Sequence, residues 1–61
     1  MLELPQLLSV EELAGLLQVP ISTIYHWRLR GEGPKPMRVG RYLRFDTADV
    51  ARWIEERKAA G

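Results

Sequence analysis

The sequence contains no cysteine and a single histidine, His26, in a chain of 61 residues. The lack of cysteine excludes a disulfide scaffold, a zinc finger and a thiol nucleophile. One imidazole without cysteine partners also argues against a transition-metal site made of protein ligands. We therefore expect neither a metal nor a cofactor.

Long apolar runs are lacking as well. Runs such as Leu7–Leu8 and residues 19–21 are far shorter than the roughly 20 apolar residues that span a bilayer. Residues 1–5 have neither the basic flank nor the apolar stretch of a secretory signal. The chain is also too short for two independent cores or a deep catalytic pocket. These features predict one domain over residues 1–61, located in the cytoplasm, with no membrane partner.

Acidic residues are scarce in the middle of the chain. Residues 1–25 carry three acids and no base, and residues 45–61 have a net charge of −1. Residues 26–44 instead carry six bases against Glu32 alone, a net charge of +5. The bases are Arg28, Arg30, Lys35, Arg38, Arg41 and Arg44. A block of one sign is what a surface that binds a polyanion requires.

A first helix is predicted after Ser9. Ser9 and Glu12 have the spacing of a capping box, so the helix should begin at Val10. It should end near Gln18, because Pro20 disfavours helical geometry in the residue before it.

A second helix should run from about Ile21 to Arg30 and end at Gly31, where glycine accepts a left-handed conformation. The apolar residues of the two helices form a shared core typical of a helix-turn-helix. These residues are Leu13, Ala14, Leu17, Val19, Ile24 and Trp27.

Residues 37–45 alternate in the way that predicts two short strands. A two-residue loop, residues 40–41, would pair Arg38 with Leu43 and place the arginine on an apolar face. A three-residue loop, residues 40–42, pairs Val39 with Leu43 and Met37 with Phe45, so that all four apolar side chains share a face. We predict the three-residue loop. The outer face and tip of the hairpin then carry Arg38, Arg41, Tyr42 and Arg44.

A last helix should run from about Thr47 to Ala59, capped by Asp46. Its buried stripe should be Val50, Trp53 and Ile54, and Trp27 and Trp53 should both lie in the core. The predicted order is helix, helix, two-stranded wing, helix. The expected fold is therefore mainly α with a small β-hairpin, a winged helix-turn-helix.

The exposed face of the second helix is a candidate DNA-binding surface. If Ile24 and Trp27 face inward, a rotation of 100° per residue turns Ser22 and His26 outward. Both side chains can bond bases or phosphates, and nearby Arg30 can reach phosphate or guanine. An ordinary solvated polar face is the alternative, and the basic block favours base contact.

Three neighbours on this helix are further candidates. Thr23 can contact phosphate, although its hydroxyl can equally bond within the helix. Tyr25 can expose its hydroxyl while its ring packs on the first helix. Arg28 lies nearer the core side. Packing of its aliphatic stem, or pairing of its guanidinium with an acid, is there as plausible as a phosphate contact.

The hairpin resembles the wing of a DNA-binding domain in its charge. Arg38 and Arg44 can contact backbone phosphates, and Arg41 at the tip can enter a narrow minor groove. Tyr42, beside them on the hairpin, is a further candidate for DNA contact. An edge hairpin protected from aggregation by its charges is the alternative. That alternative explains why the hairpin is charged, but not why every charge is basic.

Taken together, the motifs of residues 7–57 resemble those of the excisionase family, small winged helix-turn-helix proteins related to the MerR-type DNA-binding domain. The resemblance is carried by the segments 8–14, 19–28, 38–41, 44–45, 49–50 and 53–54, with Gly31 between them. It implies a bacterial, nucleoid-associated protein that binds and bends attachment-site DNA and helps a tyrosine or serine integrase excise a phage or integrative element. Other copies of the chain along the DNA are further expected partners, and the second helix is expected to read the major groove.

Two other functions compete with this interpretation. A small prophage transcription regulator would use the same surface at a promoter. A protein-interaction module would use the charged outer surface of the last helix. An enzyme is not expected, because His26 has no acid at helical spacing on its face and Glu55 and Glu56 do not converge. We assign no catalytic residue.

Overall fold

A three-stranded antiparallel sheet organises the chain. The computed structural model describes Leu4 and residues 6–61. The elements in chain order are β1 (Leu7–Leu8), α1 (Val10–Leu17), α2 (Ile21–Arg30), β2 (Pro36–Val39), β3 (Tyr42–Asp46) and α3 (Thr47–Ala60). β3 lies between β1 and β2. The predicted mainly helical fold with a small hairpin, compatible with a winged helix-turn-helix, is confirmed. The prediction about a secretory signal falls on residues 1–5, which lie outside the described part except for Leu4.

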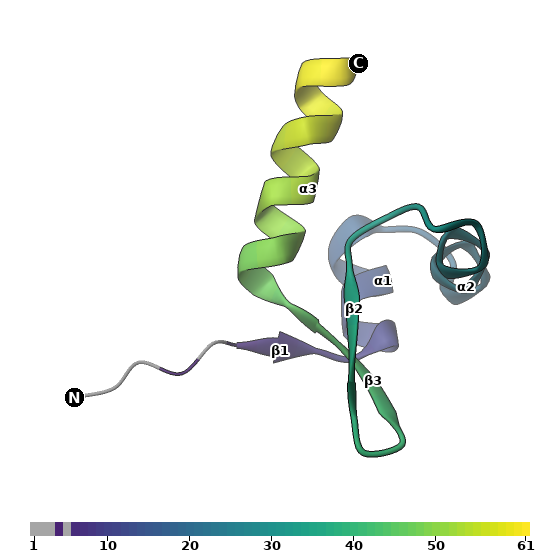
Figure 1. The fold of residues 1–61 in the computed structure, drawn as a ribbon. Helices are drawn as coiled ribbons and strands as arrows, with labels where there is room; N and C mark the ends of the chain where they lie inside the picture. Colours follow the sequence, from purple (N-terminus) through teal and green to yellow (C-terminus); the bar gives the residue numbers. More distant parts are fainter. Residues whose placement is uncertain (1–3, 5) are drawn as a thin grey trace.

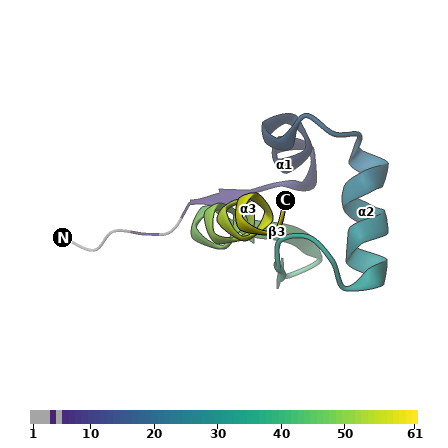
Figure 2. The ribbon, with the colours of Figure 1, turned by 90° about the horizontal axis from the view of Figure 1, so that it is seen from above.

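The helices and the hairpin are arranged around β3. α1 contacts β3 and α2, and α3 contacts β3. In Figure 1 the β2–β3 hairpin and α3 point in opposite directions from the centre of the molecule. Figures 1 and 2 both place α2 at an outer edge of the molecule. Among the described helices, none combines the length and the apolar character needed to cross a bilayer.

Local capping fixes the helix boundaries. The Glu12 amide donates to Ser9 Oγ over 3.1 Å and the Ser9 amide donates to Glu12 Oε1 over 2.9 Å, which completes the predicted capping box. α1 ends at Leu17, and its C-cap residue Gln18 adopts the left-handed conformation, φ 60° and ψ 45°. The Ala48 amide donates to Asp46 Oδ1 over 2.9 Å and caps α3. α2 has its predicted bounds, and α3 ends one residue later than predicted.

The core is made by apolar side chains from every helix and from β3. Its buried members are Val10, Leu13, Ala14, Ile24, Phe45 and Val50. Trp27 packs against this core, as predicted, but Trp53 is only half-buried and lies outside it. Instead, the centroids of the Trp53 and Trp27 rings lie 5.2 Å apart. The Arg57 guanidinium lies 5.6 Å from the centroid of the Trp53 ring. The prediction for Trp53 was wrong because α3, which projects away from the sheet (Figure 1), packs Ile54 rather than Trp53 against the core.

The β2–β3 register differs from the predicted one. Val39 pairs with Tyr42 and Arg38 pairs with Leu43, so the loop has two residues instead of three. Gly40 is the first loop residue and has φ +64°, which is the requirement of a type II′ turn. Such a turn matches the twist of the flanking strands. The hairpin tip extends beyond the core, so burial of four apolar side chains does not decide the register.

The observed register also changes the faces of the hairpin. Strand alternation places Met37, Val39, Tyr42 and Arg44 on the outer face, and Arg38 on the inner face with Leu43 and Phe45. The prediction that Arg38 shares the outer face with Tyr42 and Arg44 was therefore wrong. Arg38 stays exposed because it lies near the tip, where the inner face no longer meets the core.

The loop after α2 depends on Gly33. Gly33 has φ +80°, and a Cβ built on it would lie 2.9 Å from Trp27 Cε3. We expect Gly33→Ala to lower the free energy of unfolding by about 1–3 kcal/mol, because it combines backbone strain with a collision against a half-buried ring. Thermal unfolding followed by circular dichroism measures the change. Gly15→Ala is the matched control, since Gly15 lies in α1 with no atom within 4 Å of an added Cβ. It should stabilise the domain by roughly 0.5–1 kcal/mol, and equal effects of the two variants would contradict the role of Gly33.

Candidate nucleic-acid interface

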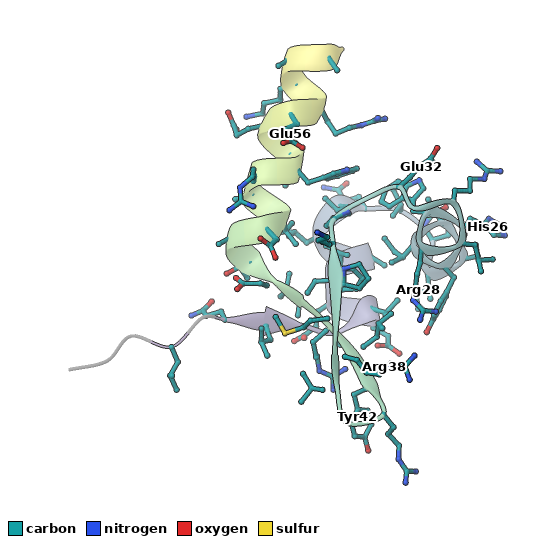
Figure 3. The ribbon with its side chains drawn as sticks, in the orientation of Figure 1. His26, Arg28, Glu32, Arg38, Tyr42 and Glu56 are labelled. Atoms are coloured by element: carbon teal, nitrogen blue, oxygen red, sulfur yellow. The ribbon has the colours of Figure 1, made fainter. Side chains whose placement is uncertain are left out.

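α2 presents most of its polar side chains to solvent. Ile24 is buried and Trp27 is half-buried, which leaves the opposite side of the helix uncovered. Ser22, Tyr25, His26, Arg28 and Arg30 are exposed, and Thr23 is half-buried at the edge of that side. Figure 3 shows His26 pointing away from the body of the protein and Arg28 toward the hairpin.

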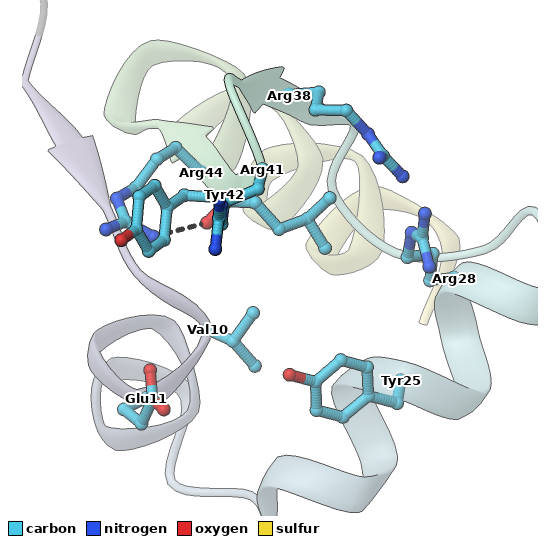
Figure 4. A pocket seen from close by; sticks show the side chains of 9 residues that line it. Val10, Glu11, Tyr25, Arg28, Arg38, Arg41, Tyr42 and Arg44 are labelled. Carbon is cyan, nitrogen blue, oxygen red and sulfur yellow. Dashed lines mark hydrogen bonds between the residues drawn. The ribbon is translucent and has the colours of Figure 1, made fainter.

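An open groove of about 500 Å³ lies between the start of α1, α2 and the β2–β3 hairpin. We call it the arginine groove, because four arginines are among its lining residues. The lining residues are Val10, Glu11, Tyr25, Arg28, Arg38, Arg41, Tyr42, Leu43 and Arg44 (Figure 4). Glu11 is the one acid on the lining. The fold therefore converts a basic segment of the sequence into a concave basic surface.

Arg28 and Arg38 reach toward the same end of the arginine groove from opposite walls (Figure 4). Within residues 6–61, the ion pairs are Arg52 with Asp49 and Lys58 with Glu55, both on α3 and both 3.2 Å long. The four groove arginines thus have no acidic partner among the described residues. Like charges gathered in a concave surface attract a polyanion more strongly than the same charges spread apart.

Arg44 is held more firmly than its neighbours. Its Nη1 donates to the Leu43 carbonyl over 2.7 Å, and its guanidinium lies 5.2 Å from the centroid of the Tyr42 ring. The bond and the cation–π contact fix the side chain before any ligand arrives. Arg41 is one of the two loop residues at the hairpin tip. Arg44 therefore presents a positive charge that is already fixed in place, and Arg41 presents its charge at the exposed tip.

The structure gathers six of the predicted site residues in one groove. Tyr25 and Arg28 come from α2, and the others are Arg38, Arg41, Tyr42 and Arg44 of the hairpin. Ser22, Thr23, His26 and Arg30 do not line the groove and lie elsewhere on α2. Glu11 and Val10 were missed, because nothing in the local sequence relates the start of α1 to the hairpin. Among the described residues, no three His, Asp or Glu side chains form a group that could hold a metal.

Comparison with known families identifies the fold family of the chain. A family described as a helix-turn-helix domain matches residues 7–58 of the chain, from β1 through most of α3. This family consists of small DNA-binding domains and includes excisionase-like proteins. Neither the curated proteins nor the solved structures gave a significant match.

Proposed function

Because the chain belongs to the helix-turn-helix domain family, whose domains bind double-stranded DNA, we propose that α2 and the β2–β3 hairpin contact one duplex together. α2 enters the major groove with Ser22, Tyr25 and His26 toward the bases, and Thr23 and Arg30 reach adjacent phosphates. The hairpin acts as a wing, with Arg41 directed into the neighbouring minor groove.

The arginine groove is the observation that carries this proposal. Arg28 on α2 and Arg38 on the wing face a common space without an acidic partner in the described chain. One phosphate backbone passing between α2 and the wing can accept from both guanidinium groups. Phosphate contacts of this kind set the position and register of a protein on DNA.

The finer role that we propose is that of an excisionase, a DNA-bending factor that directs an integrase toward excision. The resemblance of residues 7–57 to excisionases supports it, and so does a family that includes excisionase-like proteins. Two contact regions, α2 and the wing, also suit a protein that holds DNA in a bent form. The protein contributes architecture rather than catalysis, in keeping with a family that is typically non-enzymatic. It works in the nucleoid beside the integrase and other copies of itself.

An excision assay tests this role. With the matching integrase and attachment-site DNA, we expect excision to need the protein, and circularly permuted fragments to show a bend when it binds. Normal excision without the protein would contradict the excisionase role while leaving DNA binding intact. Protection of a promoter, with no effect on excision, would instead indicate the prophage regulator that shares this surface.

A further inference from the structure

An apolar ridge runs along the outward side of α2. Ile21, Tyr25 and Leu29 are spaced by four residues, so their side chains lie next to one another along the helix. Their exposed fractions are 41%, 46% and 81%. Single exposed apolar residues are ordinary, but three aligned on one helix form a surface. Leu29 lies outside the core and outside the residues packed against it.

Cations border this ridge. Arg28 lies next to Tyr25 on the helix surface, three residues further along, and Arg30 follows Leu29 in the sequence; both are exposed. A purely apolar partner would leave these guanidinium groups without a counter-charge. The DNA major groove offers both features, since phosphates line its edges and each thymine places a 5-methyl group on its floor.

We propose that the Ile21–Tyr25–Leu29 ridge reads thymine 5-methyl groups, with Leu29 making the main contact. The inference rests on the proposed DNA binding by α2 and adds to it the kind of base that the helix selects. Ser22 lies about 20° from Leu29 around the helix axis by the rotation of 100° per residue. It can therefore bond a base edge while Leu29 covers a neighbouring methyl group.

The size of the effect follows from burial of one methyl group. Removing a single thymine 5-methyl group should weaken binding about fourfold, the factor expected for one buried methylene-sized group. The loss should be confined to the one or two thymines that face the ridge. Thymines elsewhere in the site should tolerate removal of the methyl group.

The experiment uses a duplex selected from a randomised library by the full chain. Each thymine of that duplex is replaced in turn by deoxyuridine, which lacks the methyl group and keeps the base pair. Affinity is measured for the unaltered protein and for Leu29→Ala, which should stay folded because alanine favours the helix and Leu29 is exposed. Leu16→Ala is the matched control, an exposed leucine on α1 outside the arginine groove.

We expect the unaltered protein and Leu16→Ala to lose about fourfold in affinity at the same thymines. Leu29→Ala should bind the thymine and deoxyuridine duplexes equally well. Binding that ignores every deoxyuridine substitution would overturn this inference alone, and so would a Leu29→Ala variant that keeps the sensitivity. A library that yields no bound duplex would overturn the proposed function together with the inference.

Discussion

Replacing Arg28, Arg38 and Arg41 together by alanine is expected to weaken binding to duplex DNA by about 1,000-fold or more at low salt. Each arginine can make a charge-assisted bond to phosphate, and such a bond contributes about 1.5 kcal/mol. The three residues line one groove and have no acidic partner among the described residues. The slope of log affinity against log salt should also become shallower by about 2.7, because each lost phosphate contact removes about 0.9. Fluorescence anisotropy over a range of salt concentrations measures both quantities.

A variant with the same change in charge separates position from net charge. Arg52, Arg57 and Lys58 all lie on α3, outside the arginine groove, and two of them are already paired with acids. Their joint replacement by alanine removes three positive charges from the chain. We expect it to weaken binding only a few-fold through the long-range field. Equal losses in the two triple variants would show that net charge, rather than the groove, determines binding.

Replacing Phe45 by alanine is expected to leave most of the protein unfolded at 25 °C. Phe45 is 2% exposed at the centre of the sheet. Truncating a buried phenylalanine costs about 3–5 kcal/mol, which is as large as the roughly 3–5 kcal/mol of stability that a core of this size supplies. Far-ultraviolet circular dichroism should show loss of helix before heating.

Met37→Ala is the matched variant on the neighbouring strand. Met37 is 39% exposed on the outer face of the hairpin, opposite Arg44. We expect it to lower the free energy of unfolding by less than about 1 kcal/mol, since most of a half-exposed side chain is not buried on folding. The three-residue loop would instead put Met37 opposite Phe45 on the apolar face. A cost of 2 kcal/mol or more, the usual range for a buried methionine, would contradict the observed register.

The helices of this domain were predictable because their ends are set by local chemistry. Ser9 and Glu12 bond each other's amides at the start of α1, and Asp46 caps α3 through the Ala48 amide. Pro20 and Gly31 bracket α2 in the same local way. Each of these signals lies within a few residues of the boundary that it determines, so a single sequence carries it.

The hairpin register and β1 depend on contacts that the local sequence does not show. Both loop lengths satisfy the alternation of residues 37–45, and the choice follows from how far the hairpin extends past the core. β1 has two residues, Leu7 and Leu8, and it is a strand because it pairs with Asp46 and Phe45 far along the chain. Trp53 was assigned to the core from its helical spacing, yet its neighbour Ile54 packs against the core while Trp53 lies beside Trp27.

The basic character of the site was predictable from the sequence, but the arrangement of its arginines was not. The six bases of residues 26–44 mark the basic surface in the sequence. The wrong register hid that Arg38 turns toward Arg28, and the arginine groove needs that pair. A shift of one residue in a hairpin moves every side chain to the other face, so the register decides which arginines meet.

An NMR titration of the full chain with a duplex selected from a randomised library tests most directly whether α2 and the wing hold one duplex between them. The backbone amides of residues 21–30 and 38–44 should show the largest shifts, and they should move together as the duplex is added. The amides of residues 51–60 on α3 should change little, because that helix points away from the hairpin. Shifts confined to α3, or to only one of α2 and the hairpin, would contradict a duplex that α2 and the wing contact together.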